Sequence, residues 1–100
     1  MVLIELNRLI DLCQFEGNKN IRALIVPWDK YGFVLMVKSR QKVLILRTKS
    51  APKPRVFKRI DTAIGICQQI GFSSVTIQFL SEHLEFDKPN WLKSEDDENE

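Results

Sequence analysis

The amino-acid sequence predicts an α+β fold: an antiparallel sheet of four or five strands with two helices packed on one face, in the order α-β-β-β-(β)-α-β. Apolar residues recur at spacings of three and four over residues 2–15 and 59–70, which indicates two amphipathic helices. Residues 31–38 and 43–49 are rich in β-branched and aromatic side chains and are joined by a short polar link, as in a hairpin. The length of 100 residues, 44% of them hydrophobic, is typical of one globular domain.

The first predicted helix covers residues 2–15. Glu5, Arg8 and Asp11 are left to solvent, and Gly17 follows as a stop signal. The apolar stripe of this helix consists of Val2, Leu3, Leu6, Leu9, Ile10 and Cys13.

The first predicted strand covers residues 21–27. Pro27 has no backbone N–H to donate, so we expect it at the strand end or on a sheet edge. Asp29 and Gly32 mark the turn that follows.

The two strands of the predicted hairpin are apolar on both sides. Phe33, Leu35 and Val37 project one way, whereas Val34 and Met36 project the other way. A strand that is apolar on both sides is buried on both sides. The two helices account for one face of the sheet, and a short chain has little left for the other. The pattern therefore predicts a homodimer.

The connection after the hairpin, residues 50–54, reads as rigid and polar. Residues 55–57 are expected to form one more short strand. The last predicted strand covers residues 73–79, where apolar and polar side chains alternate.

The second predicted helix covers residues 59–70. Asp61 and Thr62 suit its first turn, and Gly71 suits the C′ position that ends it. Gly65 lies inside the helix, where glycine costs about 1 kcal/mol relative to alanine. We interpret this glycine as a sign that the helix packs closely on a strand.

We expect residues 1–92 to form a single α+β domain and residues 93–100 to be a disordered acidic tail. The N-terminal segment lacks a basic region before its apolar residues, so we expect no signal peptide, no membrane span and a cytoplasmic location. Cys13 and Cys67 fall on the apolar sides of the two helices. They are expected to be buried thiols and not a disulfide.

Charge is distributed unevenly along the chain. Residues 1–29 carry a net charge of −1 and residues 61–100 a net charge of −7, but the stretch between Asp29 and Asp61 has ten basic residues and no acidic one. Such a stretch creates a local positive potential and predicts an anionic partner. Its basic residues are Lys30, Lys38, Arg40, Lys42, Arg47, Lys49, Lys53, Arg55, Lys58 and Arg59.

The cations that flank predicted loops and element ends form the candidate nucleic-acid interface, for DNA or RNA. Cations in such places reach backbone phosphates, and a helix N-terminus supplies N–H groups beside them. The alternative is that these basic residues keep the strand edges soluble and discourage edge pairing. The predicted interface consists of Lys38, Arg40, Lys42, Lys53, Arg55, Lys58 and Arg59.

Three aromatic residues, Trp28, Tyr31 and Phe33, lie beside the basic stretch. Exposed aromatic rings among cations stack on nucleobases. Aromatic rings where a strand begins are more often part of a core or a dimer interface, and we favour this second interpretation.

No constellation of catalytic or metal-ligating residues stands out. His83 is the single histidine, the two cysteines lie far apart, and no glycine-rich phosphate loop is present. We therefore predict no enzyme, no metal site and no cofactor.

Residues 54–79, PRVFKRIDTAIGICQQIGFSSVTIQF, combine a basic Pro-Arg turn, a Phe-Lys pair, an amphipathic helix with a glycine stop, and a strand. This segment resembles a stretch in small plasmid-encoded accessory proteins of partition and stability operons. Arg59 departs from the small polar residue expected at the start of the helix. The resemblance implies an accessory role in plasmid or mobile-element maintenance, with no catalytic residues to carry over. The matching residues are Pro54, Arg55, Phe57, Lys58, Asp61, Ala63, Ile70 and Gly71.

Two function classes follow. The first is a non-enzymatic accessory protein associated with nucleic acid through the basic segment 38–59. The second is a protein–protein interaction module or homodimeric adaptor that binds no nucleic acid. Salt dependence separates them, because phosphate binding weakens steeply with salt whereas an apolar interface does not.

Overall fold

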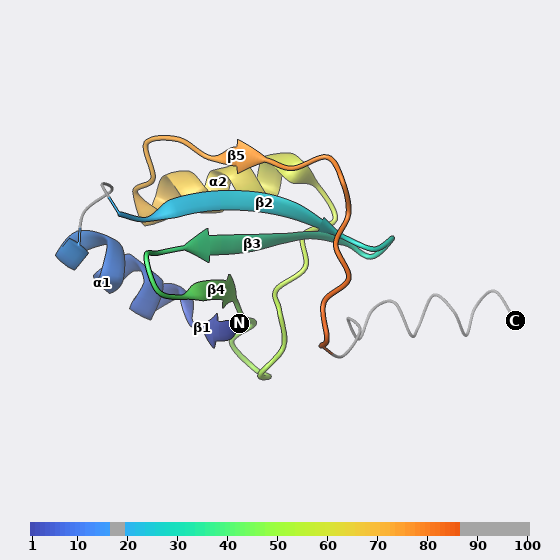
Figure 1. The fold of residues 1–100 in the computed structure, drawn as a ribbon, viewed down its shortest axis with the longest axis horizontal. Coiled ribbons are helices and arrows are strands. Elements are labelled where there is room, and N and C mark those ends of the chain that lie inside the picture. Colours follow the sequence, from blue (N-terminus) through green and yellow to red (C-terminus); the bar gives the residue numbers. More distant parts are fainter. Residues whose placement is uncertain (17–19, 87–100) are drawn as a thin grey trace, which may run out of the picture.

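A computed structural model describes residues 1–16 and 20–86. It confirms an α+β fold, with two helices and a five-stranded sheet in the order β1-β4-β3-β2-β5 (Figure 1). The elements along the chain are β1 (Val2–Ile4), α1 (Leu6–Glu16), β2 (Arg22–Trp28), β3 (Gly32–Lys38), β4 (Val43–Leu46), α2 (Ile60–Ile70) and β5 (Thr76–Ile77).

The sheet is mixed, so the prediction of an antiparallel sheet is wrong for its two edge strands. Strands β2, β3 and β4 form an antiparallel meander, as the hairpin pattern predicts. Strand β1 runs parallel to β4, and β5 runs parallel to β2. The physical reason lies in the helices. Each helix is a crossover that returns the chain in its original direction, which gives the units β1-α1-β2 and β4-α2-β5.

Residues 2–4 form the edge strand β1, whereas the sequence predicted them as the first turn of a helix. Three consecutive apolar residues fit either period, and β-branched Val2 and Ile4 favour the strand. Val2 pairs with Leu44 and Ile4 pairs with Leu46. The helix then begins behind Glu5, whose carbonyl accepts the backbone N–H of Leu9 at 2.9 Å.

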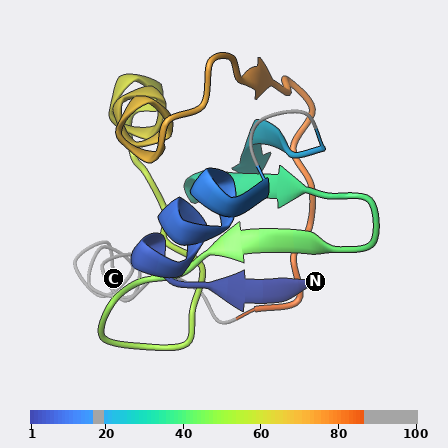
Figure 2. The same cartoon turned by 90° about the vertical axis from the view of Figure 1, so that its left-hand side faces the viewer.

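Both helices pack on the same face of the sheet (Figure 2), as predicted. Leu9 and Cys13 of α1 and Ala63, Cys67 and Ile70 of α2 are buried there. Both cysteines are free thiols, as predicted. The strand residues beneath the helices include Ala23, Ile25, Leu35, Val37, Leu44 and Leu46.

The opposite face of the sheet is also buried within the one chain. Val34 and Ile45 are fully buried in this second cluster, together with Leu84 from the segment that follows β5. That segment runs along the side of the sheet away from the helices (Figure 2). The chain therefore supplies its own second layer, and the reason for expecting a second copy no longer holds. The homodimer itself stays a prediction.

A few backbone hydrogen bonds attach the long connection between β4 and α2 to the sheet. The N–H of Arg55 donates to the carbonyl of Leu46 at 2.8 Å, and Phe33 and Phe57 exchange two backbone hydrogen bonds, each 2.8 Å long. Isolated bridges join Pro54 to Arg47 and Phe57 to Phe33, in place of the short strand predicted over residues 55–57. Pro54 precedes them and has no N–H with which to extend a ladder.

Helix α2 ends as predicted. Gly71 has a φ of 109°, and its N–H donates to the carbonyls of Cys67 and Gln68, while Phe72 N–H donates to Cys67. The interpretation of Gly65 is wrong, because this glycine is exposed and nothing lies within 4 Å of the position of a Cβ.

The predicted strand at residues 73–79 shortens to β5, because the chain leaves the ladder after Ile77. The predicted stop at Gly17 and the predicted tail at residues 93–100 lie outside the described residues. No helix in the described ranges is long and apolar enough to span a bilayer.

Candidate nucleic-acid interface

The fold divides the basic stretch into two groups at opposite ends of β3. Lys38 is the last residue of this strand, and the turn that follows it contains Arg40 and Lys42. Phe33, near the start of the strand, pairs with Phe57, which directly precedes Lys58 and Arg59. Phe33 and Lys38 are five positions apart along the strand, roughly 17 Å at 3.4 Å per residue. The seven predicted cations therefore fall into two groups, one toward each end of β3.

The β3–β4 turn holds its cations outward. Ser39 N–H donates to the carbonyl of Lys42 at 2.9 Å, and Lys42 N–H donates to Ser39 Oγ at 3.2 Å. These bonds close the turn and leave Arg40 and Gln41 exposed at its tip. No carboxylate of residues 1–15 or 20–86 forms an ion pair with Lys38, Arg40 or Lys42.

A groove of about 1070 Å³ lies beside this turn. Helix α1 lines it with one stripe of residues at spacings of three and four: Arg8, Asp11, Leu12 and Phe15. The edge strand β1, strand β4 and the turn line the rest of the groove.

The groove is basic. Arg8, Arg40, Lys42 and Arg47 line it, against the two carboxylates of Glu5 and Asp11. Arg47 Nε donates to the carbonyl of Thr48 at 3.1 Å, which turns part of its guanidinium toward its own loop. In the described part of the chain, neither carboxylate lies within ion-pair distance of any of these four cations.

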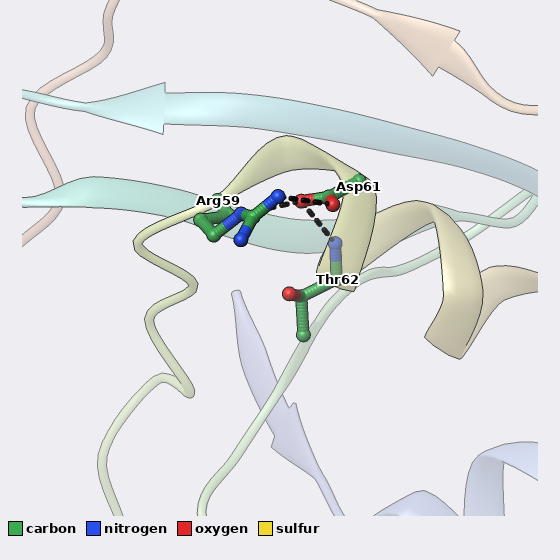
Figure 3. Close-up of polar contacts among 3 residues, drawn as sticks. All are labelled: Arg59, Asp61 and Thr62. Atoms are coloured by element: carbon green, nitrogen blue, oxygen red, sulfur yellow. Dashed lines mark hydrogen bonds and ion pairs between the residues drawn. The ribbon is translucent and has the colours of Figure 1, made fainter.

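The group at the other end of β3 is engaged within the fold. Arg59 Nε and Nη2 donate to the two oxygens of Asp61 at 3.1 and 2.8 Å (Figure 3). The guanidinium of Arg55 lies over the ring of Phe57, 4.9 Å from its centroid. Lys53 and Lys58 also take part in contacts of the folded chain.

The N-terminus of α2 already holds an anion. Asp61 Oδ1 accepts the backbone N–H of Thr62 at 3.0 Å, and the same carboxylate binds Arg59 (Figure 3). One backbone N–H of the helix start and the neighbouring guanidinium therefore already have a carboxylate partner, whereas the N-cap residue Arg59 makes no side-chain capping bond. A phosphate placed here would have to displace a carboxylate, so the geometry favours the groove over the helix start.

The aromatic residues beside the basic stretch belong mainly to the core. Trp28 is 1% exposed and packs edge-on against Tyr31, with ring centroids 5.2 Å apart and an interplanar angle of 87°. Phe33 is half-buried against the helix-side core. The preference for a core role is confirmed for Trp28, which no base can reach in this fold.

Sequence reasoning missed three residues that line the groove: Arg8, Phe15 and Arg47. Arg8 and Phe15 are seven residues apart, so helical spacing already places them on one face. The missing information was the neighbour of that face, which depends on β1 and its parallel register with β4.

Outside the groove, the described residues with titratable or nucleophilic side chains include His83 and Cys67. His83 is exposed, and its Nδ1 lies 3.1 Å from Asp29 Oδ2. Burial raises the pKa of the Cys67 thiol to about 11, so it is protonated at neutral pH. Over the described ranges, no three or more His, Cys, Asp or Glu side chains gather as metal ligands would.

Comparison with known proteins finds no matching family model, no matching curated protein and no matching solved structure. The resemblance of residues 54–79 to plasmid accessory proteins therefore stays a prediction from sequence.

Proposed function

We propose that this chain is a non-enzymatic accessory protein that binds the phosphate backbone of DNA or RNA along the groove beside α1. The observation that carries the proposal is the gathering of four cations, from three separate parts of the chain, around one concave surface. They are Arg8, Arg40, Lys42 and Arg47. The sequence resemblance adds plasmid or mobile-element maintenance as the setting for this activity.

The electrostatics support a phosphate ligand. The cations at the turn are exposed and form no ion pair with residues 1–15 or 20–86, so binding phosphate breaks no ion pair within these residues. Contacts to phosphate fix the position of a nucleic acid but read no bases. We therefore expect little sequence preference.

The proposal predicts how steeply the binding affinity falls with salt concentration. Each neutralised phosphate contributes about 0.7 to the log–log slope of affinity against salt for a single strand, and about 0.9 for a duplex. Four cations then give a slope of about −3 to −4.

The test is an anisotropy titration of labelled DNA and RNA oligonucleotides between 50 and 200 mM salt. The variant Arg40→Gln/Lys42→Gln removes the two turn cations, and we expect the slope to fall by about 1.4–1.8. The matched control is Lys30→Gln/Lys49→Gln, which removes two exposed cations of the same stretch that do not line the groove. We expect the control to keep the wild-type slope.

Two results would overturn the proposal. Equal losses in the two double variants would mean that net charge acts without a site. An absence of binding by the wild type at 50 mM salt would remove the nucleic-acid function altogether.

The second candidate is a homodimeric adaptor, and one observation favours it. Strand β5 pairs with β2 at Ile25 and Ile77, and the next bridge joins Trp28 to Glu82. The chain after β5 therefore has two extra residues, which bulge outward and leave Phe79 and Leu80 90% and 80% exposed.

The Gln78 side chain holds this bulge. Its Nε2 donates to the carbonyl of Leu80 at 2.9 Å and to Glu82 Oε1 at 3.1 Å. An exposed pair of apolar side chains is suited to bury against a second copy. If sedimentation at micromolar concentration shows a dimer in wild type and a monomer in Phe79→Ser/Leu80→Ser, this adaptor role gains support. A wild type that sediments only at 11.7 kDa would exclude it.

A further inference from the structure

We propose that the groove takes single-stranded nucleic acid, with the ring of Phe15 stacked on an unpaired base. The inference rests on the proposed function and names the class of ligand. Its carrying observation is that Phe15 is 90% exposed and lines the same groove as the four cations.

Phe15 shares the groove lining with other apolar residues. It lies in the last turn of α1, three residues beyond half-buried Leu12, and Leu44 of β4 also lines the groove. The groove thus combines an apolar part with a basic part. Proteins that bind single strands use this combination, because each nucleotide presents a flat base and a charged phosphate.

The carboxylates of the groove give the ligand an orientation. Glu5, Asp11 and one of the four cations, Arg8, belong to the N-terminal segment and α1. The other three cations, Arg40, Lys42 and Arg47, come from the opposite lining. Phosphates are repelled by the carboxylates and attracted by the cations of β4 and its turn. The backbone of the strand is therefore placed along β4, and its bases turn toward α1 and Phe15.

A duplex does not offer this contact. Its bases are stacked on one another and expose only their edges in the grooves, so a side chain reaches a base face only after a base step is unstacked. Phosphate contacts remain possible for a duplex, but the contribution of Phe15 is specific to unpaired bases.

The chain contains a matched control for Phe15. Phe79 is also 90% exposed, but it lies in the bulge after β5 and does not line the groove. A general effect of removing an exposed aromatic ring would weaken binding in both Phe15→Ala and Phe79→Ala. Loss of stacking in the groove would weaken binding only in Phe15→Ala.

The experiment measures the affinity of a labelled 12-nucleotide single strand and of the matching duplex at fixed salt. We expect Phe15→Ala to weaken single-strand binding by about 5- to 150-fold, the loss of one stacked base. Duplex binding should be unchanged. Phe15→Leu, which keeps an apolar side chain without a ring, should lose as much as Phe15→Ala, and Phe15→Trp should retain binding.

The outcomes separate the two proposals. If Phe15→Ala binds the single strand like wild type or like Phe79→Ala, or weakens both ligands equally, stacking is overturned while the cationic groove stands. If wild type binds neither ligand, both proposals fail. Melting curves of each variant confirm that it is folded.

Discussion

Arg22 and Lys38 lie directly opposite each other in the β2–β3 ladder, so two exposed cations share one cross-strand position beside the β3–β4 turn. Leu24 and Met36, two residues along each strand, belong to the second-face cluster. Because side chains alternate, Arg22 and Lys38 project from that face. Positive charge therefore continues from the groove around this end of the sheet.

Reversing one charge of this pair should raise stability and lower binding. Like charges directly opposite are destabilising, and opposite charges contribute about 0.2–1 kcal/mol. We predict that Lys38→Glu raises the free energy of unfolding by about this amount in urea titrations and weakens nucleic-acid binding. Lys49 is not part of the β3–β4 ladder, so no cation lies opposite it in that ladder. The control Lys49→Glu should therefore not gain stability. A Lys38→Glu variant that binds as tightly as wild type would show that this end of the sheet does not contact the ligand.

Gly32, the first residue of β3, lies against the connection between β4 and α2. A Cβ at this position would lie 2.5 Å from the carbonyl oxygen of Phe57 and 2.9 Å from Val56 Cγ1, and the φ of Gly32 is 142°. We predict that Gly32→Ala costs about 1–3 kcal/mol of stability, because the backbone of Phe57 must shift. Urea denaturation measures the loss, and wild-type stability would mean that the Phe33–Phe57 bridge is not held this closely.

Gly65 gives the opposite expectation. It is exposed in α2, and nothing lies within 4 Å of the position of its Cβ. We predict that Gly65→Ala stabilises the protein by about 0.5–1 kcal/mol through helix propensity alone. A loss of stability in the same denaturation experiment would indicate a packing role that the fold does not show.

Burial of Cys67 makes stability depend on pH in the alkaline range. Desolvation raises the pKa of this thiol from 9.0 to about 11 in the folded state, against the lowering effect of a backbone hydrogen bond. Its contribution to stability is complete below pH 9 and is lost as the pH rises through 11. We predict that wild-type stability falls more steeply than that of Cys67→Ala between pH 9 and 11. Parallel curves for the two proteins would contradict this account.

The sequence predicted the elements whose signals are local. The β3–β4 hairpin follows from two β-rich runs around a polar link, and α2 follows from its apolar stripe and Gly71. Apolar residues on both alternations of β3 correctly indicated burial on both faces. The sequence assigned the cover of the second face to another copy of the chain, whereas Leu84 of the same chain packs there. Leu84 lies in a segment without periodicity, so the sequence did not predict this contact.

The features that create the groove are not local. Three residues are too few to distinguish a strand from a helical turn. The sequence therefore predicted residues 2–4 as part of the first helix, and the parallel pairing of β1 with β4 was not predicted. Without β1, nothing in the sequence indicated that Arg8 and Arg47 line the same groove. The sequence grouped cations that were neighbours along the chain, whereas the fold separates them by the length of β3 and gathers others from distant segments.

Amide chemical-shift mapping with an unlabelled single-stranded oligonucleotide tests the central claim most directly, because it locates the ligand without any substitution. We predict that the perturbed amides concentrate in α1 from Arg8 to Phe15 and in residues 39–47, with little change at residues 53–61. Perturbations centred on residues 53–61 or on the Phe79–Leu80 bulge, or no perturbation at 50 mM salt, would contradict the account.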